Sequence, residues 1–310
     1  MRLGVLAILT ASALAQEAPT FKTAVSLVHV DAEVTAADGR VLEGFTKDDF
    51  RIFDEGKQQP IVNFSAGEEA LDLILLFDVS GSMRPKIQEV AAAAHEGVQE
   101  LRKGDRVSIA VFNTHTRVIA PFTEDLEAVQ RSIQEDVLGL HFGGGTFIQS
   151  AVSDSARRLM DQPRTSRRRA VLVITDDMGQ RTRRESTVVT ELWEADALLT
   201  GLIVRSELIQ TLHTINTITH PYLIGLQAGV KGIAEKTGGD FIHAGAAGQA
   251  FQESMRRIRQ RYSLYYPMPE GKPGAHRAIK VELTGDAAKR NPKARVRTRT
   301  GYVVPPKETR

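Results

Sequence analysis

The chain has 310 residues, of which 42% are hydrophobic and 25% are charged, a composition typical of a globular protein with room for two domains. Its formal net charge is only +2, so no strong field favours nucleic acid as a partner. It contains no cysteine, which excludes disulfides, thiolate metal sites, cysteine nucleophiles and a lipid anchor on an N-terminal cysteine.

Residues 1–15 have the pattern of a cleavable secretory signal peptide. Arg2 supplies a positive charge, Leu3 to Ala11 is largely apolar, and Ala13-Leu14-Ala15 resembles a small-x-small cleavage site. The apolar part is too short to span a membrane, which takes about 20 residues, and no later segment reaches that length without charges. We expect a mature chain in the periplasm or outside the cell; the alternative is a frayed N-terminal helix of a cytosolic protein.

Residues 21–66 form a β-rich head. The stretch "VSLVHVDAEVTA" alternates apolar and polar residues, which predicts a half-buried strand. Turn signals occur at Ala37-Asp38-Gly39 and at "DEGKQQ". We expect "FRIFD" and "PIVNFS" to be the two strands of a hairpin around the second turn.

Residues 70–262 alternate strands and helices. Strands are expected at 73–77, 106–113, 170–175 and 198–204. Helices with spacing near 3.6 residues are expected at 87–101, 126–133, 147–160, 186–195, 230–237 and 251–262. The strand with "TRVIAPF" is expected to pair as a hairpin with "RVSIAVFN". This alternation predicts βαβ units, and hence a doubly wound, mostly parallel, Rossmann-like α/β sheet.

The tail at residues 263–304 is β-like again, with strands expected in "LYYPM", "AIKVEL" and "RVRTRTGYVV". Head and tail each have about 40 residues, and domains below about that size usually need disulfides or other crosslinks to be stable. The chain has no cysteine to form such disulfides. We therefore expect head and tail to pack together as one β-sandwich-like domain, with the α/β domain inserted between them.

Three oxygen-bearing side chains follow the first buried strand of the α/β region. Asp78, Ser80 and Ser82 are spaced two apart in "FDVSGSM", so in an extended loop they can point to the same side. In an open parallel sheet, ligands bind beyond the carboxyl ends of the strands. Carboxylate and hydroxyl oxygens are ligands of hard cations, magnesium before the softer metals.

Two further ligand candidates follow other elements. Thr146 comes after three glycines, which allow close approach of the backbone. Asp176 ends the apolar strand "AVLVIT", although an aspartate there is also ordinary turn chemistry. The glycine-rich loop lacks the lysine of a phosphate-binding P-loop.

Together these motifs resemble the metal-ion-dependent adhesion site of the von Willebrand factor A (VWA) domain. Carried over residue by residue, the resemblance implies a Mg²⁺ site, with Mn²⁺ or Ca²⁺ as alternatives, held by Asp78, Ser80, Ser82, Thr146 and Asp176. Asp177 stands where that family most often has glycine, and it adds a negative charge near the site. In related domains the last helix can shift on ligation, a role that we assign to the helix ending near Tyr262.

The resemblance covers nearly the whole mature chain. "LVHVDAEVTAADGRVLEGFTKDDFRIFDEGKQQPIVNFS", "AEKTGGDFIHA", "YSLYY" and "VRTRTGYVVP" are similar to a bacterial group of secreted VWFA-related proteins. It implies a secreted adhesion-type module that binds an Asp or Glu of a partner protein through the cation, without being an enzyme. Two alternatives are a Mg²⁺-dependent hydrolase and a structural envelope protein with a vestigial metal site.

Two arginine-rich runs bear on this interpretation. Arg164 to Arg169 precedes a strand, so it is expected at the edge of the sheet opposite the metal, as a solvated loop. Arg181 to Arg184 follows Asp176 on the metal side, where it either steers an acidic partner or is simply solvated. His141 lies near the glycine-rich loop, either at the rim of the site or on the surface.

Overall fold

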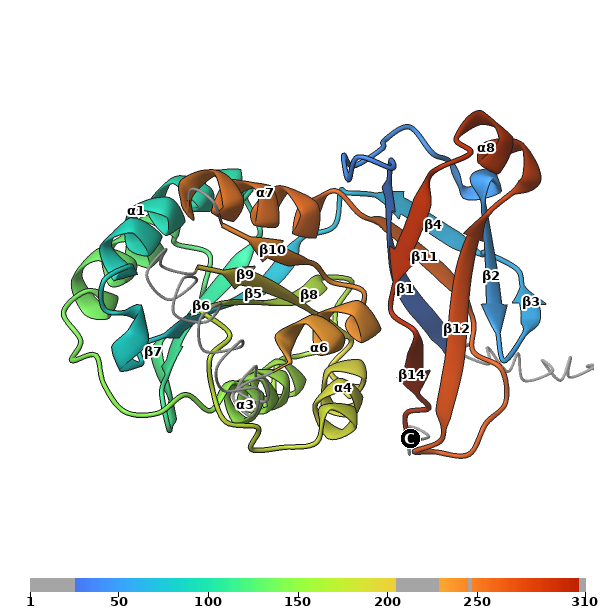
Figure 1. The fold of residues 1–310 in the computed structure, drawn as a ribbon. Helices are drawn as coiled ribbons and strands as arrows, with labels where there is room; N and C mark the ends of the chain where they lie inside the picture. The colour runs from blue at the N-terminus through green and yellow to red at the C-terminus, as the bar shows by residue number, and fades with distance from the viewer. Residues whose placement is uncertain (1–25, 205–228, 245–246, 307–310) are drawn as a thin grey trace, which may run out of the picture.

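The computed structural model describes residues 26–204, 229–244 and 247–306, which form two lobes joined by α7 and β11 on one side and by β4 and β5 on the other (Figure 1). The α/β lobe contains β5 (Leu71–Asp78), α1 (Ile87–Gly97), β6 (Arg106–Phe112), β7 (Thr116–Thr123), α2 (Leu126–Arg131), α3 (Ile148–Met160), β8 (Arg168–Thr175), α4 (Glu185–Glu194), β9 (Ala197–Ile203), α6 (Val230–Thr237), β10 (Phe241–His243) and α7 (Ala247–Arg259). The β lobe contains β1 (Leu27–Thr35), β2 (Phe50–Asp54), β3 (Lys57–Gln59), β4 (Asn63–Ala66), β11 (Tyr262–Pro267), β12 (His276–Leu283), α8 (Gly285–Arg290), β13 (Arg295–Thr298) and β14 (Gly301–Val303).

The α/β lobe is built on a six-stranded sheet with the order β10-β9-β8-β5-β6-β7. All neighbours are parallel except β6 and β7, which form the expected antiparallel hairpin. From β5 the chain adds β6 and β7 on one side. It then crosses to the other side of β5, where it adds β8, β9 and β10. The predicted doubly wound sheet is confirmed, and its switch point lies between β5 and β8, where such sheets bind ligands.

Both faces of this sheet are covered by helices, which explains the uninterrupted apolar strands. All eight residues of β5 are buried. Leu73 and Leu75 pack against one layer, with α1 and α7, while Ile74 and Leu76 pack against the other, with α3, α4 and α6. A π-helical segment, Ser132–Val137, continues α2 and also covers the first face.

The β lobe consists of two four-stranded sheets around a third apolar core. Their orders are β13-β1-β11-β4 and β14-β12-β2-β3, so each sheet contains strands from both ends of the chain. This arrangement agrees with the predicted sandwich-like class. The expected hairpin was wrong in its second strand: β2 pairs with Lys57–Gln59, whereas "PIVNFS" overlaps β4, which pairs with β11. Glu55 and Gly56, both with positive φ, form a tight turn. This turn pairs β2 with the residues that follow it immediately, those of β3.

The last helix of the α/β lobe ends earlier than the sequence pattern indicates. Helix α7 ends at Arg259, and Tyr262 is the first residue of β11. Tyr262 continues the helical spacing by coincidence, because its ring packs in the β-lobe core against Phe45 and Phe50. The expected shift of the last helix on ligation would therefore concern α7, which ends at Arg259, three residues before Tyr262.

The arginine run before β8 lies at the edge of the sheet facing the β lobe, but it is not a solvated loop throughout. The side chain of Arg168 is only 1% exposed. Its guanidinium donates to Asp31 Oδ1 (2.8 Å) in β1, to the carbonyl of Arg259 (2.9 Å) at the end of α7, and to Ser263 Oγ (2.8 Å) in β11. The run of arginines in the sequence cannot reveal that the β lobe covers Arg168.

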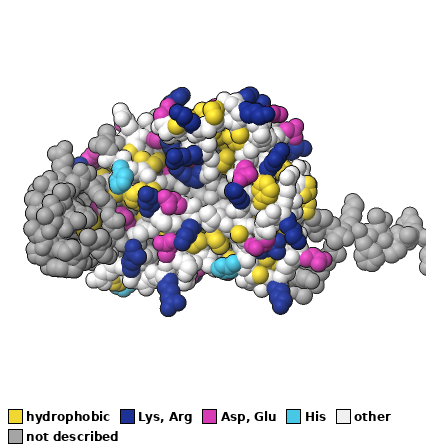
Figure 2. Space-filling model, turned by 45° about the vertical axis from the view of Figure 1, so that its right-hand side comes forward, with side chains coloured by type: hydrophobic (Ala, Val, Ile, Leu, Met, Phe, Trp, Pro, Cys, Tyr) yellow, Lys and Arg dark blue, Asp and Glu magenta, His cyan; other side chains and the backbone are white. Residues whose placement is uncertain are grey.

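The surface carries charges of both signs. Figure 2 shows Lys and Arg side chains interspersed with Asp and Glu on the face it presents, with hydrophobic side chains in small separate groups. Within the described parts of the chain, no helix is both long and apolar enough to cross a membrane.

Candidate metal centre

Asp78 is the last residue of β5, and both of its carboxylate oxygens are held in place. The backbone N–H of Ser80 donates to Oδ1 (2.9 Å), and Thr175 Oγ1 donates to Oδ2 (2.6 Å). The residue is fully buried. Since Thr175 ends the neighbouring strand β8, the parallel pairing of β5 with β8 positions this carboxylate.

The two serines follow in a short turn. Ser80 is buried and Ser82, within the 3-10 turn Gly81–Met83, is exposed. Their Oγ atoms lie 3.2 Å apart, so the alternate spacing in the sequence does bring the two hydroxyls to one side. One hydroxyl thus lies at the protein interior and the other at the solvent boundary, as a site open to an external ligand requires.

The glycine-rich loop lies directly against this turn. The N–H of Gly143 donates to the carbonyl of Val79 (3.1 Å), and Asn113 Nδ2 donates to the carbonyl of Gly143 (3.1 Å). At the end of the loop, Phe147 N donates to the carbonyl of Asn113 (2.9 Å). These bonds anchor Thr146, which is buried, between β6 and the start of α3.

The loop after β8 closes the third side. Asp176 is buried, and its Oδ1 accepts from Met178 N (3.0 Å). Gln180 N donates to the carbonyl of Thr146 (3.3 Å). A Cβ on Gly179 would lie 2.5 Å from that same carbonyl oxygen, so only glycine permits this approach. The structure thus brings the three predicted loops to one edge, while the role of the five residues as ligands remains a prediction.

The electrostatics of this edge are dominated by the burial of a carboxylate, with a second carboxylate close by. Burial raises the pKa of Asp78 to about 6; the hydrogen bonds from Ser80 and Thr175 oppose the shift, and the charge of Asp176 adds to it. Two carboxylates and three hydroxyls, with no sulfur or imidazole among them, are a donor set that fits a hard cation such as Mg²⁺. A cation would offset the repulsion between the two aspartates.

Asp177 adopts a left-handed backbone conformation, with φ of 58°. Glycine enters this region freely, and aspartate tolerates it better than most residues. The side chain is buried, and its Oδ1 accepts from the N–H of Val230 (3.4 Å), the first residue of α6. Its negative charge is therefore directed at least partly to a helix N-terminus, where it is favourable.

Two features of the molecule were missed by the sequence analysis. Thr175 orients Asp78, yet in the sequence it is one more residue of a buried strand. The second is a cluster at the other end of the sheet, where His29, Asp31 and Glu69 lie within reach of a single ion. The Arg168 guanidinium beside Asp31 makes that cluster an ion-pair network.

The second arginine run lies on the metal side, as expected, and is partly used by the fold. Arg183 pairs with Glu191 Oε1 (2.9 Å) and with Ser153 Oγ (3.2 Å), which joins the loop to α4 and α3. Arg184 precedes α4 as its N-cap residue. His141 is exposed and lies two residues before Gly143.

Comparison with known proteins adds to this picture. Residues 73–180 match the family model of the von Willebrand factor type A domain, whereas curated proteins give no match. Among solved structures, the conserved hypothetical protein BatB from Bacteroides thetaiotaomicron is 18% identical, with a TM-score of 0.47 over 61% of this chain and 97% of that chain. A von Willebrand factor type A protein from Catenulispora acidiphila is 11% identical, with a TM-score of 0.46 over 91% of this chain and 75% of that chain.

The matched segment runs from β5 through the glycine-rich loop to Gln180, just after Asp176, and so contains all five predicted ligands. Its match to the family model and the doubly wound sheet agree with the resemblance seen in the motifs. The α/β lobe of this chain is a von Willebrand factor type A domain.

Proposed function

We propose that the protein is a secreted binding module whose cation, held at the carboxyl edge of the sheet, ligates an acidic residue of a partner protein. Domains of this family generally serve as protein-interaction modules and commonly bind a divalent metal. Asp78, Ser80, Ser82, Thr146 and Asp176 would hold the ion, preferentially Mg²⁺, and Mn²⁺ or Ca²⁺ in its place. Export follows from the signal-like residues 1–15, which lie outside the described part of the chain.

The observation that carries this proposal is the fixed carboxylate of Asp78 beside the paired hydroxyls of Ser80 and Ser82. Mg²⁺ prefers octahedral coordination and usually keeps several waters. With neutral hydroxyls supplying part of the shell, a cation held here would be able to exchange a bound water for an incoming carboxylate. The exposed side of Ser82 gives access from solvent.

Binding is favoured over catalysis by the same geometry. The Oγ atoms of Ser80 and Ser82 lie beside each other, and within the described residues no histidine is hydrogen-bonded to either. A nucleophile usually needs a base within hydrogen-bond reach.

The test is calorimetric titration of residues 16–310 with Mg²⁺ and Mn²⁺. Saturable binding is expected for the wild type and for Asp286→Ala, whose side chain lies exposed on α8. It should be lost in Asp78→Ala and in the isosteric Asp78→Asn, with the fold verified by circular dichroism. Unchanged titration of a folded Asp78→Asn protein would place the ion elsewhere and end the proposal. Secretion is checked separately, by mass spectrometry of the exported chain, which should begin at Gln16.

A further inference from the structure

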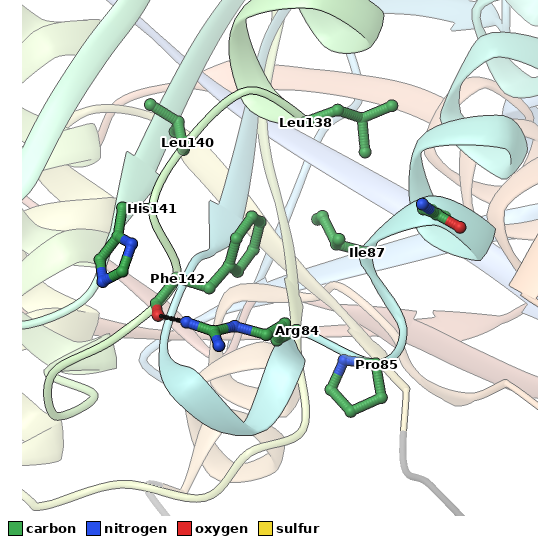
Figure 3. Close-up of a pocket in the computed structure, with 8 residues that line it drawn as sticks. Arg84, Pro85, Ile87, Leu138, Leu140, His141 and Phe142 are labelled. Carbon is green, nitrogen blue, oxygen red and sulfur yellow. Dashed lines mark hydrogen bonds between the residues drawn. The ribbon is translucent and has the colours of Figure 1, made fainter.

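A pocket of about 580 Å³ opens beside the metal edge (Figure 3). One wall comes from the start of α1, and the other from the segment that leads into the glycine-rich loop. The volume lies within the range of about 300–1,000 Å³ in which proteins bind ligands. The two walls extend directly from the loops of the metal centre, because Arg84 follows Ser82 by two residues and Phe142 immediately precedes Gly143.

The lining of this pocket is apolar with a basic rim. Ile87 and Phe142 are buried, and Leu138 and Leu140 are half-buried and pack against the core of the lobe. In Figure 3 the side chains of Leu138, Ile87 and Phe142 point into the same space. Arg84 and His141, both exposed, stand at the rim.

The pocket is held rigidly to the metal centre. The guanidinium of Arg84 donates to the carbonyl of Phe142 (2.6 Å), which ties the two walls together (Figure 3). The next residue, Gly143, donates to Val79 between Asp78 and Ser80. A partner bound at the cation therefore meets a preformed pocket. Filling this pocket requires little loss of conformational entropy in the protein.

We propose that this pocket receives a large apolar side chain of the same partner segment whose acidic residue ligates the cation; the proposal rests on the function proposed above. Two residues of chain span at most about 7 Å, and an extended peptide advances about 3.3 Å per residue. The apolar side chain therefore lies about two to four residues from the acidic one. The basic rim favours a partner segment of net negative charge.

The experiment uses a displayed library of random peptides with one fixed central Asp, selected on residues 16–310 in Mg²⁺ and, in parallel, in chelator. The expected enrichment depends on Mg²⁺ and shows Phe, Tyr, Trp or Leu at a constant offset from the Asp. The best peptide is then synthesised, and its affinity is measured against pocket variants.

The pocket variants are Leu140→Asp and the milder Leu140→Ser, and the control is Val62→Asp, an exposed apolar position in the β lobe (52% exposed). Burying a large apolar side chain supports an affinity difference of about 10- to 100-fold. We expect that loss in the pocket variants, with Mn²⁺ titration unchanged, and no loss in Val62→Asp. The unchanged titration also verifies that the variants are folded.

The outcomes separate the two proposals. Peptides enriched in Mg²⁺ with no apolar preference, or with equal affinity for the Leu140 variants, would overturn the pocket while leaving the metal-dependent function intact. Peptides enriched equally in chelator would overturn the function itself, and with it the pocket.

Discussion

At the scale of single residues, Asp177 shows how a departure from a family pattern is accommodated. A left-handed backbone normally selects glycine, but an aspartate here also accepts a hydrogen bond from the start of α6. The extra charge next to Asp176 thus has a structural use, and its position explains why the sequence can dispense with glycine.

Two substitutions of Asp177 that both remove the carboxylate should therefore differ in stability. Asp177→Ala must adopt a positive φ with a Cβ, whereas Asp177→Gly need not, so the alanine variant should be less stable by about 1 kcal/mol. Urea denaturation measures the difference. Equal midpoints would show that the backbone conformation carries no cost at this position.

A second prediction concerns Thr175, the partner of Asp78 Oδ2. In Thr175→Val the shape is conserved, but the buried carboxylate loses its short hydrogen bond. Unfolding free energy should fall by about 1–3 kcal/mol. Mn²⁺ affinity should weaken by about 10- to 100-fold, as when the supporting residue of a metal ligand is removed. Thr200→Val, a buried threonine in β9, is the matched control, and its Mn²⁺ affinity should stay near the wild-type value.

At the scale of elements, α1 and α7 approach closely at one glycine. A Cβ on Gly97 would lie 2.0 Å from Cδ1 of Phe251, so the small residue on α1 is required by the ring on α7. This contact sets the spacing of the two helices over the first face of the sheet.

Gly97→Ala is therefore expected to destabilise the protein by about 1–3 kcal/mol through overpacking, as measured by thermal or urea unfolding. Adding Phe251→Leu should recover part of the loss, since it removes the clashing Cε1 and leaves Cδ atoms that can rotate away from the added methyl group. Gly285→Ala, where nothing lies within 4 Å of the added Cβ, should be neutral. A neutral Gly97→Ala would mean that α7 moves aside freely.

The sequence predicted the elements of the α/β lobe well because their signals are local. A strand buried on both faces is apolar throughout, and the helices repeat their apolar residues at helical spacing. Five predicted ligands were placed at strand ends and loops, and the structure brings those loops together. What the sequence could not show depended on distant partners: the role of Thr175 requires β5 beside β8, and the burial of Arg168 requires the β lobe.

At the scale of the whole molecule, the lobes meet through an interlobe ion-pair network of His29, Asp31, Glu69, Arg168, Asp196 and Arg299. His29 Nδ1 lies 3.0 Å from Asp196 Oδ2, and Arg299 contacts the other oxygen of that carboxylate at 2.7 Å. Burial by itself would lower the pKa of His29, but the charges of Asp31 and Asp196 outweigh it and raise the pKa to about 10. Burial opposes the shift of Asp196, whose pKa falls to about 2 beside His29 and Arg299.

The protonated imidazole should make stability depend on pH. Because the pKa of His29 is raised from 6.5 to about 10, its contribution is complete below pH 6.5 and is lost as the pH rises toward 10. Between pH 7 and 9 the wild type should lose about 1–3 kcal/mol of unfolding free energy that His29→Gln does not lose. Urea unfolding at several pH values provides the measurement, and parallel curves for the two proteins would contradict the prediction.

The domain organisation remains a prediction that the pairing of strands supports. The chain leaves the β lobe after Ala66 and returns to it at Tyr262. These two residues are directly paired in β4 and β11. Deleting residues 67–261 and joining the two ends by a short turn should therefore leave a folded β sandwich. Aggregation or an unfolded circular-dichroism spectrum of that deletion protein would argue that the β lobe depends on the inserted domain.

The paired exit and entry points also have a mechanical consequence. A partner pulling on the cation edge would apply tension through both connections at once, and so to the same end of the β4–β11 pair. Because both strands are pulled in the same direction, the force does not separate them from each other and is resisted by the pairing of β11 with β1. The salt bridges of Arg168 and Arg299 lie in parallel with these connections, so they share the force before the strands are loaded.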